Sequence, residues 1–360
     1  MTRKRKRKGR IDYALFAQRF ENARLAAGLT QAELAKTMEG VISAKTIPKY
    51  ESGEIMPKAV PFILMCRGLE ISPDYFFTPF RPEIQNIHFR KPLSLGARKN
   101  KAVELQVADT VERFLNIEET LGIGFDFHNP LEQMEISKLE DVERAVDVLR
   151  EEWKLGVHAL PNVIEILEGN EIRTVEVDAD LTFDGLAGLA DGRLPFIALN
   201  KNLDLEGKRL TVLRELGHGA LQFPKDLSEK EKSRFCEAFA RSMLIPKETF
   251  LKALGRPKRK QVSIQELIGI RETFGLGLQA IMVRALDLGM IRPTTHKKFK
   301  KFIDSLEEGT DLGAYMGKEA PNRVKQLVYR ATSEETINQA LATDILNVNY
   351  RGFQKDFTVF

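Results

Sequence analysis

The stretch that decides the fold of most of this chain is Leu213–His218, which reads Leu-Arg-Glu-Leu-Gly-His. A His-Glu-x-x-His helix places two imidazoles on one face as zinc ligands, and its glutamate serves as general base to a metal-bound water. This sequence keeps the glutamate, Glu215, and the second histidine, His218, but Arg214 occupies the first histidine position. A guanidinium has no acceptor and a permanent charge, so it cannot ligate zinc. The stretch therefore predicts a zinc-hydrolase type of helix that has lost one ligand.

The composition limits the class of protein. The chain has 360 residues, of which 43% are apolar and 29% charged, as in soluble globular proteins with two or three domains. No apolar run approaches the ~20 residues of a membrane span, and Met1–Arg10 lacks the apolar core of a secretory signal. Cys66 and Cys236 lie in separate apolar patterns and indicate buried thiols in a reducing compartment. We expect a cytoplasmic, nucleoid-associated protein of bacterial or phage origin without a membrane partner.

The positive charge is concentrated at the N-terminus. Seven Lys and Arg residues fall within the first ten positions; removing them from the net charge of +4 leaves −3 for the rest of the chain. Basic arms of this kind follow DNA phosphates or enter the minor groove. We expect residues 1–10 to be a disordered arm that contacts DNA through Arg3, Arg5 and Arg7. A solubilising tail or, in a eukaryotic host, an import-like signal are the alternatives.

Five short helices are predicted between Ala14 and Phe77. The first ends at Gly28, and Thr30 and Glu33 form a capping box that begins the second. Ser43 is a natural N-cap for a third helix that extends through Glu51. The remaining two are expected at Phe62–Leu69 and Pro73–Phe77.

The pattern Leu-Thr-Gln-x-Glu-Leu-Ala from Leu29, followed by Ser-x-x-Thr-Ile-x-x-Tyr-Glu-x-Gly from Ser43, resembles the Xre/Cro-type helix-turn-helix family over this whole module. The resemblance implies sequence-specific binding of double-stranded DNA by a homodimer. It also implies that a set of side chains faces the groove and the phosphates: Gln31, Ser43, Ala44, Lys45, Thr46 and Lys49. Ile47 and Tyr50 are expected in the small core. For the two lysines, ordinary solvated charge is the alternative.

Two features depart from that family pattern. The turn between the second and third helices is two residues longer than usual, and Pro48 lies inside the predicted recognition helix. Proline removes an intrahelical hydrogen bond, so we expect a kinked or shortened helix beyond Ile47. DNA contact would then depend on the helix start, Ser43–Thr46, which is the end that meets base edges.

After a connector with three prolines, helices are expected at residues 100–122 and 138–155, followed by a helical stretch at Pro161–Glu168. Residues 172–177 alternate like a strand, and Asp191-Gly192 is a strong hairpin signal between Gly185–Ala190 and Arg193–Leu199. Pro195 predicts that the return strand is at an edge or bulged. An exposed edge next to the Leu213–His218 helix would suit an extended peptide that adds as a strand.

This order, together with Leu244-Ile245-Pro246-Lys247-Glu248, resembles the ImmA/IrrE metallopeptidase-like domain from about His88 to Met290. In that family a residue on the helix after the motif completes the metal site. The positional candidate is Glu237, with Glu231 and Cys236 as alternatives. We expect a vestigial, empty site: Glu215 in the catalytic position, His218 and Glu237 in the metal positions, and Arg214 as the disrupting residue. A pair between Arg214 and Glu215 or Glu237 would then replace the metal.

The predicted fold class is α+β and predominantly helical: a five-helix module, then a zincin-like domain with a small sheet, then a helical extension. The predicted domain ranges are a basic arm at 1–10, the DNA-binding domain at 11–80, a linker at 81–99, the metallopeptidase-like domain at 100–290 and the extension at 291–360. A helix is expected over 327–346. The tail from Val348 to Phe360 is too aromatic to be free, so we expect it to pack on the body or on a partner.

Three functions follow from these patterns. The favoured one is a DNA-binding transcriptional regulator, a repressor, whose second domain is a catalytically impaired sensor or protein-interaction domain. The alternatives are an active zinc metallopeptidase that cleaves a repressor or itself, and an antitoxin-type or immunity-type autorepressor that binds a partner protein. No cofactor is expected, because losing one of three protein ligands weakens zinc binding by orders of magnitude. Zinc would bind only if the degenerate site were rescued.

Overall fold

The computed structural model describes residues 12–38, 41–81, 95–255, 258–307 and 309–358, and the backbone at 87–89. The chain divides into two units. Unit 1 comprises residues 1–86, 93–124 and 324–360, and unit 2 comprises residues 87–92 and 125–323. Within the described ranges, no helix combines the length and apolarity that crossing a bilayer requires.

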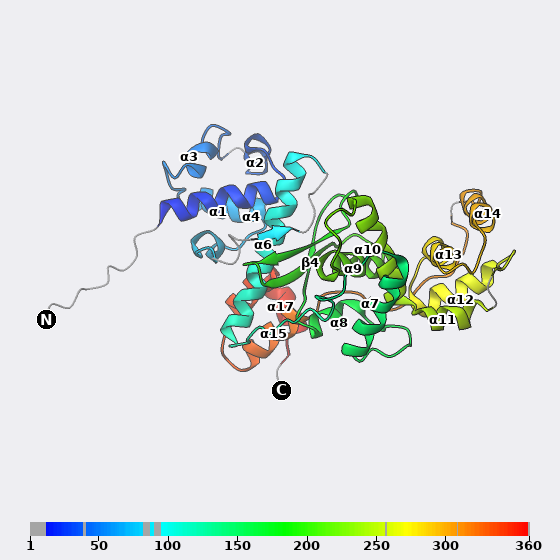
Figure 1. The fold of residues 1–360 in the computed structure, drawn as a ribbon. Helices are drawn as coiled ribbons and strands as arrows, with labels where there is room; N and C mark the ends of the chain where they lie inside the picture. The colour runs from blue at the N-terminus through cyan, green and yellow to red at the C-terminus, as the bar shows by residue number, and fades with distance from the viewer. Residues whose placement is uncertain are drawn as a thin grey trace. The chain divides into compact units, whose positions relative to one another are not determined.

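Unit 1 is entirely helical in its described part. Its helices are drawn in blue to cyan and in orange to red in Figure 1. They are α1 (Tyr13–Ala26), α2 (Gln31–Thr37), α3 (Ile47–Glu51), α4 (Ala59–Leu69), the 3-10 helix η1 (Asp74–Phe77), α6 (Ala97–Thr120), α15 (Arg323–Ser333), α16 (Gln339–Leu346) and α17 (Tyr350–Asp356).

The N-terminal module forms largely as its sequence predicts. Thr30 and Glu33 make both hydrogen bonds of a capping box at the start of α2. Phe16, Phe20 and Phe76 are fully buried, and their rings lie 5.8 to 6.4 Å apart. Aromatic pairs at such separations stabilise a core beyond their buried area. These rings hold α1 against η1.

The start of α3 differs from the prediction. The helix begins at Ile47, not after Ser43, and Pro48 lies in its first turn. In the first turn an N–H has no intrahelical acceptor, so proline is tolerated there. The expectation of a kinked or shortened helix beyond Ile47 is therefore wrong: the helix is shortened at its start, where proline marks its beginning, and it extends to Glu51. Ile47 and Tyr50 are buried, as predicted.

Helix α6 packs on α1 within unit 1. Arg19 of α1 and Glu112 of α6 form an ion pair at 2.7 Å, and both side chains are at most 5% exposed. Arg19 also donates to the backbone oxygens of Thr78 and Pro79. The predicted ranges assigned residues from 100 onward to the second domain, whereas these contacts group α6 with the N-terminal module.

The C-terminal helices belong to the same unit. The helix expected over residues 327–346 is two helices, α15 and α16, because Glu335 adopts a left-handed conformation and Asn338 caps α16. Phe353 of α17 is buried, with ring centroids 5.7 Å from Tyr329 and 5.0 Å from Phe357. This packing confirms the expectation for the aromatic tail; Phe360 lies outside the described residues.

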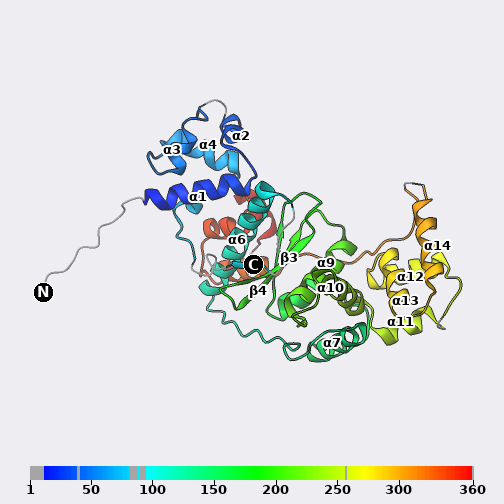
Figure 2. The ribbon, with the colours of Figure 1, turned by 45° about the horizontal axis from the view of Figure 1, so that its top comes forward.

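Unit 2 contains the sheet and most of the remaining helices, green to orange in Figures 1 and 2. Its elements are β1 (Ile87–Phe89), α7 (Leu139–Glu152), α8 (Val163–Gly169), β2 (Arg173–Val177), β3 (Gly185–Ala190), β4 (Leu194–Asn200), α9 (Leu205–Ala220), α10 (Glu229–Leu244), α11 (Lys247–Leu254), α12 (Ile264–Phe274), α13 (Leu278–Asp287) and α14 (Pro293–Asp304). The observed fold class is α+β and predominantly helical, as predicted.

The four strands lie in the order β1-β3-β4-β2. The β3–β4 hairpin turns at Asp191 and Gly192, both with positive φ, which is the geometry of a type I′ turn. Strand β4 also pairs in parallel with β2, so it is internal, and the expectation of an edge position for it is wrong. Pro195 is tolerated because pairing with β2 begins only at Phe196.

The edge next to β3 is occupied by the chain itself. Backbone pairing is antiparallel, with Ile87 opposite Ala190 and Phe89 opposite Gly188. These residues belong to the segment predicted as an extended connector. An incoming peptide strand could therefore not add to β3 along residues 188–190 without displacing β1.

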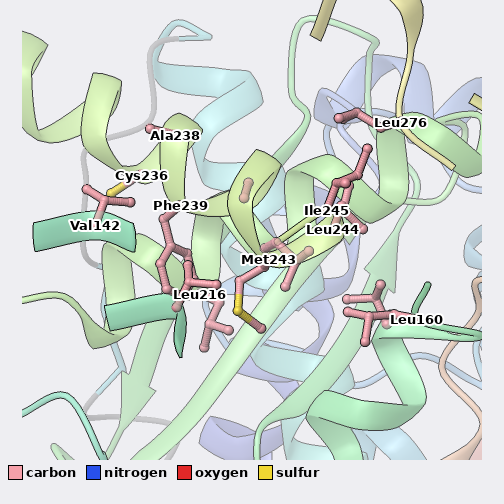
Figure 3. Packing of buried hydrophobic residues seen from close by; sticks show 14 of the residues in the cluster. Val142, Leu160, Leu216, Cys236, Ala238, Phe239, Met243, Leu244, Ile245 and Leu276 are labelled. Carbon is pink, nitrogen blue, oxygen red and sulfur yellow. The ribbon is translucent and has the colours of Figure 1, made fainter. Parts of the chain in front are cut away.

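Helices α9 and α10 pack closely against each other and, with α7, form the centre of the unit 2 core (Figure 3). A Cβ atom at Gly217 of α9 would lie only 3.2 Å from Cα and Cβ of Cys236 on α10. Gly185 of β3 is similarly close to Thr211 of α9. These two glycines bring α9 against both its neighbouring helix and the sheet, which fixes where the side chains of its motif lie.

A segment after α14 is attached to α9 by a buried ion pair. Arg209 and Glu319 are both fully buried and bonded to each other. Glu319 also accepts hydrogen bonds from the N–H groups of Val163 and Ile164, at the start of α8. The guanidinium of Arg209 lies 4.5 Å from the ring centroid of Tyr315. The pair therefore links three elements around the motif helix.

Candidate functional site

The first candidate site is the segment of unit 1 that precedes α3. Ser43, Ala44 and Lys45 are exposed in turns, and Thr46 is half-buried at the N-cap. The hydroxyl oxygens of Ser43 and Thr46 lie 2.9 Å apart. Four of the six residues predicted to face the groove and the phosphates thus lie on one short stretch that ends at the buried Ile47.

Gln31 and Lys49, the other two residues of this module that were predicted to face DNA, each bond to a glutamate. Gln31 is half-buried, and its amide nitrogen donates to Glu51 at 2.6 Å. The amide nitrogen is therefore directed toward Glu51. Lys49 is 52% exposed and pairs with Glu54 at 3.2 Å. An exposed pair of this kind contributes little energy, so it can exchange for a phosphate. Arg3, Arg5 and Arg7 lie outside the described residues.

The second candidate site surrounds Arg214 on α9. The Nε atom of Arg214 donates to Oε1 of Glu215 at 3.1 Å. Both terminal nitrogens lie 3.5 Å from Oδ2 of Asp184, just before β3. Glu215 is fully buried, whereas the side chain of Arg214 is 20% exposed. The guanidinium therefore compensates a buried carboxylate whose charge would otherwise be costly.

Asp184 is a partner of Arg214 that the sequence patterns did not indicate. It follows a loop held by Asn200, whose amide donates to the backbone oxygens of Ala179, Asp180 and Phe183 at 2.9 to 3.0 Å. Asn200, a fully buried asparagine at the end of β4, is the residue that could have pointed to this loop. Its role can be recognised only when the pairing of the strands is known.

The three residues proposed as the third metal ligand lie in different surroundings on α10. Glu237 is 52% exposed and lies 3.7 Å from Arg241, one turn further along α10. Glu231 forms the capping box of α10 with Ser228. Cys236 is buried in the core against Gly217, and His218 is half-buried on α9. Of the two predicted pairs, the structure has the one between Arg214 and Glu215.

This donor set does not fit zinc. A catalytic zinc site needs three protein ligands, and here a cation stands at the first position while the candidate third ligand is solvent-exposed and paired. No group of three or more His, Cys, Asp or Glu side chains in the described ranges is arranged to hold a metal ion. The prediction of an empty, vestigial site remains a prediction about the protein in solution.

A cavity of about 390 Å³ lies beside Glu215. Apolar parts of its wall come from Phe127, Leu189 and Phe196, while His128, Arg193 and Gln222 add polar groups. A mostly apolar concavity with a few polar groups is typical of ligand-binding sites. From the sequence, His128 was expected to be structural or exposed; it is exposed and lines this cavity. The segment after α6 that supplies Phe127 and His128 carries no recognisable motif.

Two family models match the chain. Residues 174–286 match the IrrE N-terminal-like domain, and residues 20–76 match the helix-turn-helix family. No curated protein and no solved structure matches the chain. The chain therefore combines a helix-turn-helix segment with an IrrE-like domain, as the sequence resemblance implied. The helix-turn-helix match supports a DNA-binding regulator.

Proposed function

We propose that this protein is a sequence-specific transcriptional regulator, a repressor, whose IrrE-like domain binds a ligand or a protein partner without zinc-dependent hydrolysis. The observation that carries the second half of this proposal is the bond between Arg214 and Glu215. The residue that would act as general base is buried and bonded to a guanidinium that stands in a ligand position.

The DNA-binding half of the proposal is supported by the exposed stretch before α3. One such segment contacts too few bases for selectivity, so we propose a homodimer on two half-sites one helical turn apart. Lys45 is exposed at the centre of the stretch and has no ion pair with a described residue. It is therefore the side chain that we propose to reach a base edge.

The ligand-binding half is supported by the cavity beside Glu215. Because β1 pairs with β3 along residues 188–190, we propose that the occupant enters the cavity without adding a strand at that edge. Arg193 and His128 are suited to anionic or hydrogen-bonding groups of a peptide or small molecule. We propose a sensor or interaction role for this domain, with cleavage of a repressor as the alternative that the donor set disfavours.

The first experiment tests DNA recognition. The full-length protein is incubated with random duplexes, the bound fraction is sequenced, and affinity for the selected site is measured for Lys45→Ala and for Lys101→Ala. Lys101 is an equally exposed lysine on α6 and serves as the matched control. We expect Lys45→Ala to cost about 1–3 kcal/mol on the selected site and to relax preference at one position. Recovery of no preferred sequence by the wild-type protein would contradict the proposal.

A further inference from the structure

A second cavity in unit 2, separate from the one beside Glu215, lies among α12, α13 and α14, the yellow to orange helices of Figures 1 and 2. Its volume is about 330 Å³. Its lining is mostly apolar and includes Val262, Ile264, Leu267, Met282, Phe299 and Phe302. None of these residues lines the cavity beside Glu215.

The polar residues that line this cavity are two lysines, Lys260 and Lys298, and the neutral Gln261 and Thr295. Lys260, in the loop before α12, and Lys298 of α14 both line it and are exposed. Neither forms an ion pair with a residue that the structure describes. Arg259, next to Lys260, is by contrast held by Glu266 at 2.8 Å. Within the described residues, these two lysines at the apolar cavity are thus not neutralised by an ion pair.

Helix α14 explains how this combination arises. Its Phe299 and Ile303 pack against the unit 2 core, whereas Lys297, Lys298 and Lys301 are on its exposed surface. Phe302 lines the cavity although it is 44% exposed. An exposed aromatic ring at the mouth of an apolar hollow frequently marks a binding surface.

We propose that this cavity binds a free medium-chain alkyl carboxylate, with the carboxylate between Lys260 and Lys298 and the chain on the apolar lining. Charge complementarity selects an anionic head, since both cations at the rim lack an anionic partner within the described residues. The lining selects an apolar tail. The volume is at the small end of ligand pockets, which run from about 300 to 1,000 Å³, so it suits one short chain.

The binding experiment uses isothermal titration calorimetry of the full-length protein with octanoate, decanoate and octanamide. We expect saturable one-to-one binding of both carboxylates. Decanoate should bind about 15-fold more tightly than octanoate, because each of its two additional methylenes contributes roughly a fourfold change when buried. Octanamide, which has the same tail and no charge, should bind several-fold more weakly than octanoate. No binding of decanoate, or equal binding of octanamide and octanoate, would overturn the proposal.

Charge-reversal variants locate the site. Lys260→Glu and Lys298→Glu should each weaken decanoate binding by about three- to tenfold, as expected for an exposed charge contact turned repulsive. Lys301→Glu, on the same helix but outside the cavity lining, is the matched control and should change affinity less than twofold. All three positions are exposed, so the variants should fold. An equal loss of decanoate affinity in Lys301→Glu would show that binding depends on the general positive charge of the surface. That result would overturn the proposed site.

A last experiment distinguishes binding to a membrane surface from binding of a soluble ligand. The protein is sedimented with vesicles of phosphatidylglycerol in the presence and absence of decanoate. Vesicle binding that depends equally on Lys301 and is unaffected by decanoate, without calorimetric binding of decanoate, would overturn the proposal. None of these measurements involves DNA or the cavity beside Glu215, so their outcome is independent of the proposed regulatory function.

Discussion

The stretch before α3 and the motif helix α9 carry the two predicted functional sites. They differ in the exposure and bonding of the side chains that are expected to act. Before α3, Lys45 is exposed while Ile47 beneath it is buried. On α9, Glu215 is buried and bonded to Arg214. The packing face of α9 is nevertheless intact, with Leu213 and Leu216 buried. A helix can thus keep its fold-determining face and change its chemistry, because different side chains serve the two purposes.

The largest predicted effect is on the free energy of unfolding, at a residue of α9 that is part of a buried ion pair. Arg209→Leu should lower the free energy of unfolding by about 3–5 kcal/mol, because it leaves the buried Glu319 carboxylate without its cation. Urea denaturation measures this. Arg330→Leu, which removes an exposed pair with Glu334, is the control and should change stability by less than about 0.5 kcal/mol. Restoration of part of the stability in the Arg209→Leu, Glu319→Leu double variant would show that the uncompensated charge is the cause; no such recovery would contradict it.

The next effect concerns the chemistry of the same helix. Arg214→His should raise zinc affinity by at least about 100-fold, because it restores a direct ligand, and even the removal of a residue that only orients a ligand costs about 10–100-fold. The wild-type protein should contain no stoichiometric zinc by mass spectrometry. Full affinity and activity should not return, since Glu237 is exposed and paired with Arg241. Metal-dependent cleavage by the unmodified protein, abolished in Glu215→Gln, would instead support an active peptidase.

Glu168 is a second buried acid, and it can be compared with Glu215, which is bonded to Arg214. Glu168 is 9% exposed; its Oε2 accepts from the N–H groups of Asn322 and Arg323, whereas Oε1 has no hydrogen-bond partner in the described structure. Burial raises the pKa of Glu168 from 4.5 to about 7, against the lowering effect of these donors. The folded state then binds the proton more tightly than the unfolded state. The free energy of unfolding therefore falls as the pH rises from 4.5 to about 7.

Glu168→Gln tests this pH dependence. The amide is neutral at every pH and its oxygen can still accept from both N–H groups, so the variant should be about 3 kcal/mol more stable than the wild type at pH 8. The difference should shrink toward pH 4. Glu152→Gln, at an exposed position of α7, is the control. Parallel stability curves for wild type and Glu168→Gln across this range would contradict the prediction.

The smallest effect on sequence preference is expected from the N-terminal arm. Deletion of Thr2–Arg10 should weaken binding to all duplexes alike, because arginine contacts to phosphates carry no base information. The slope of log affinity against log salt should become shallower by about 0.9 for each phosphate that the arm neutralises in the full-length protein. Binding to the selected site and to a scrambled duplex, measured at several salt concentrations, checks this. An unchanged slope would identify the arm as a solubilising tail.

The sequence determined those features that depend on neighbouring residues. The capping box at Thr30 begins α2 where predicted, because cap and helix lie within four residues. The Asp191-Gly192 turn formed for the same reason. The replacement of the first histidine was also visible in the sequence alone, because ligation depends on residue type.

Only the tertiary structure decided the features that depend on distant parts of the chain. Pro195 lies in an internal strand because β2 pairs one residue later, and α6 joins the N-terminal module through the ion pair between Glu112 and Arg19. The exposure of Glu237 and the approach of Asp184 to Arg214 follow from how α10 and the β3 loop pack on α9. Helical periodicity fixes which residues share a face, but the partner that each face meets is set by packing between elements far apart in the sequence.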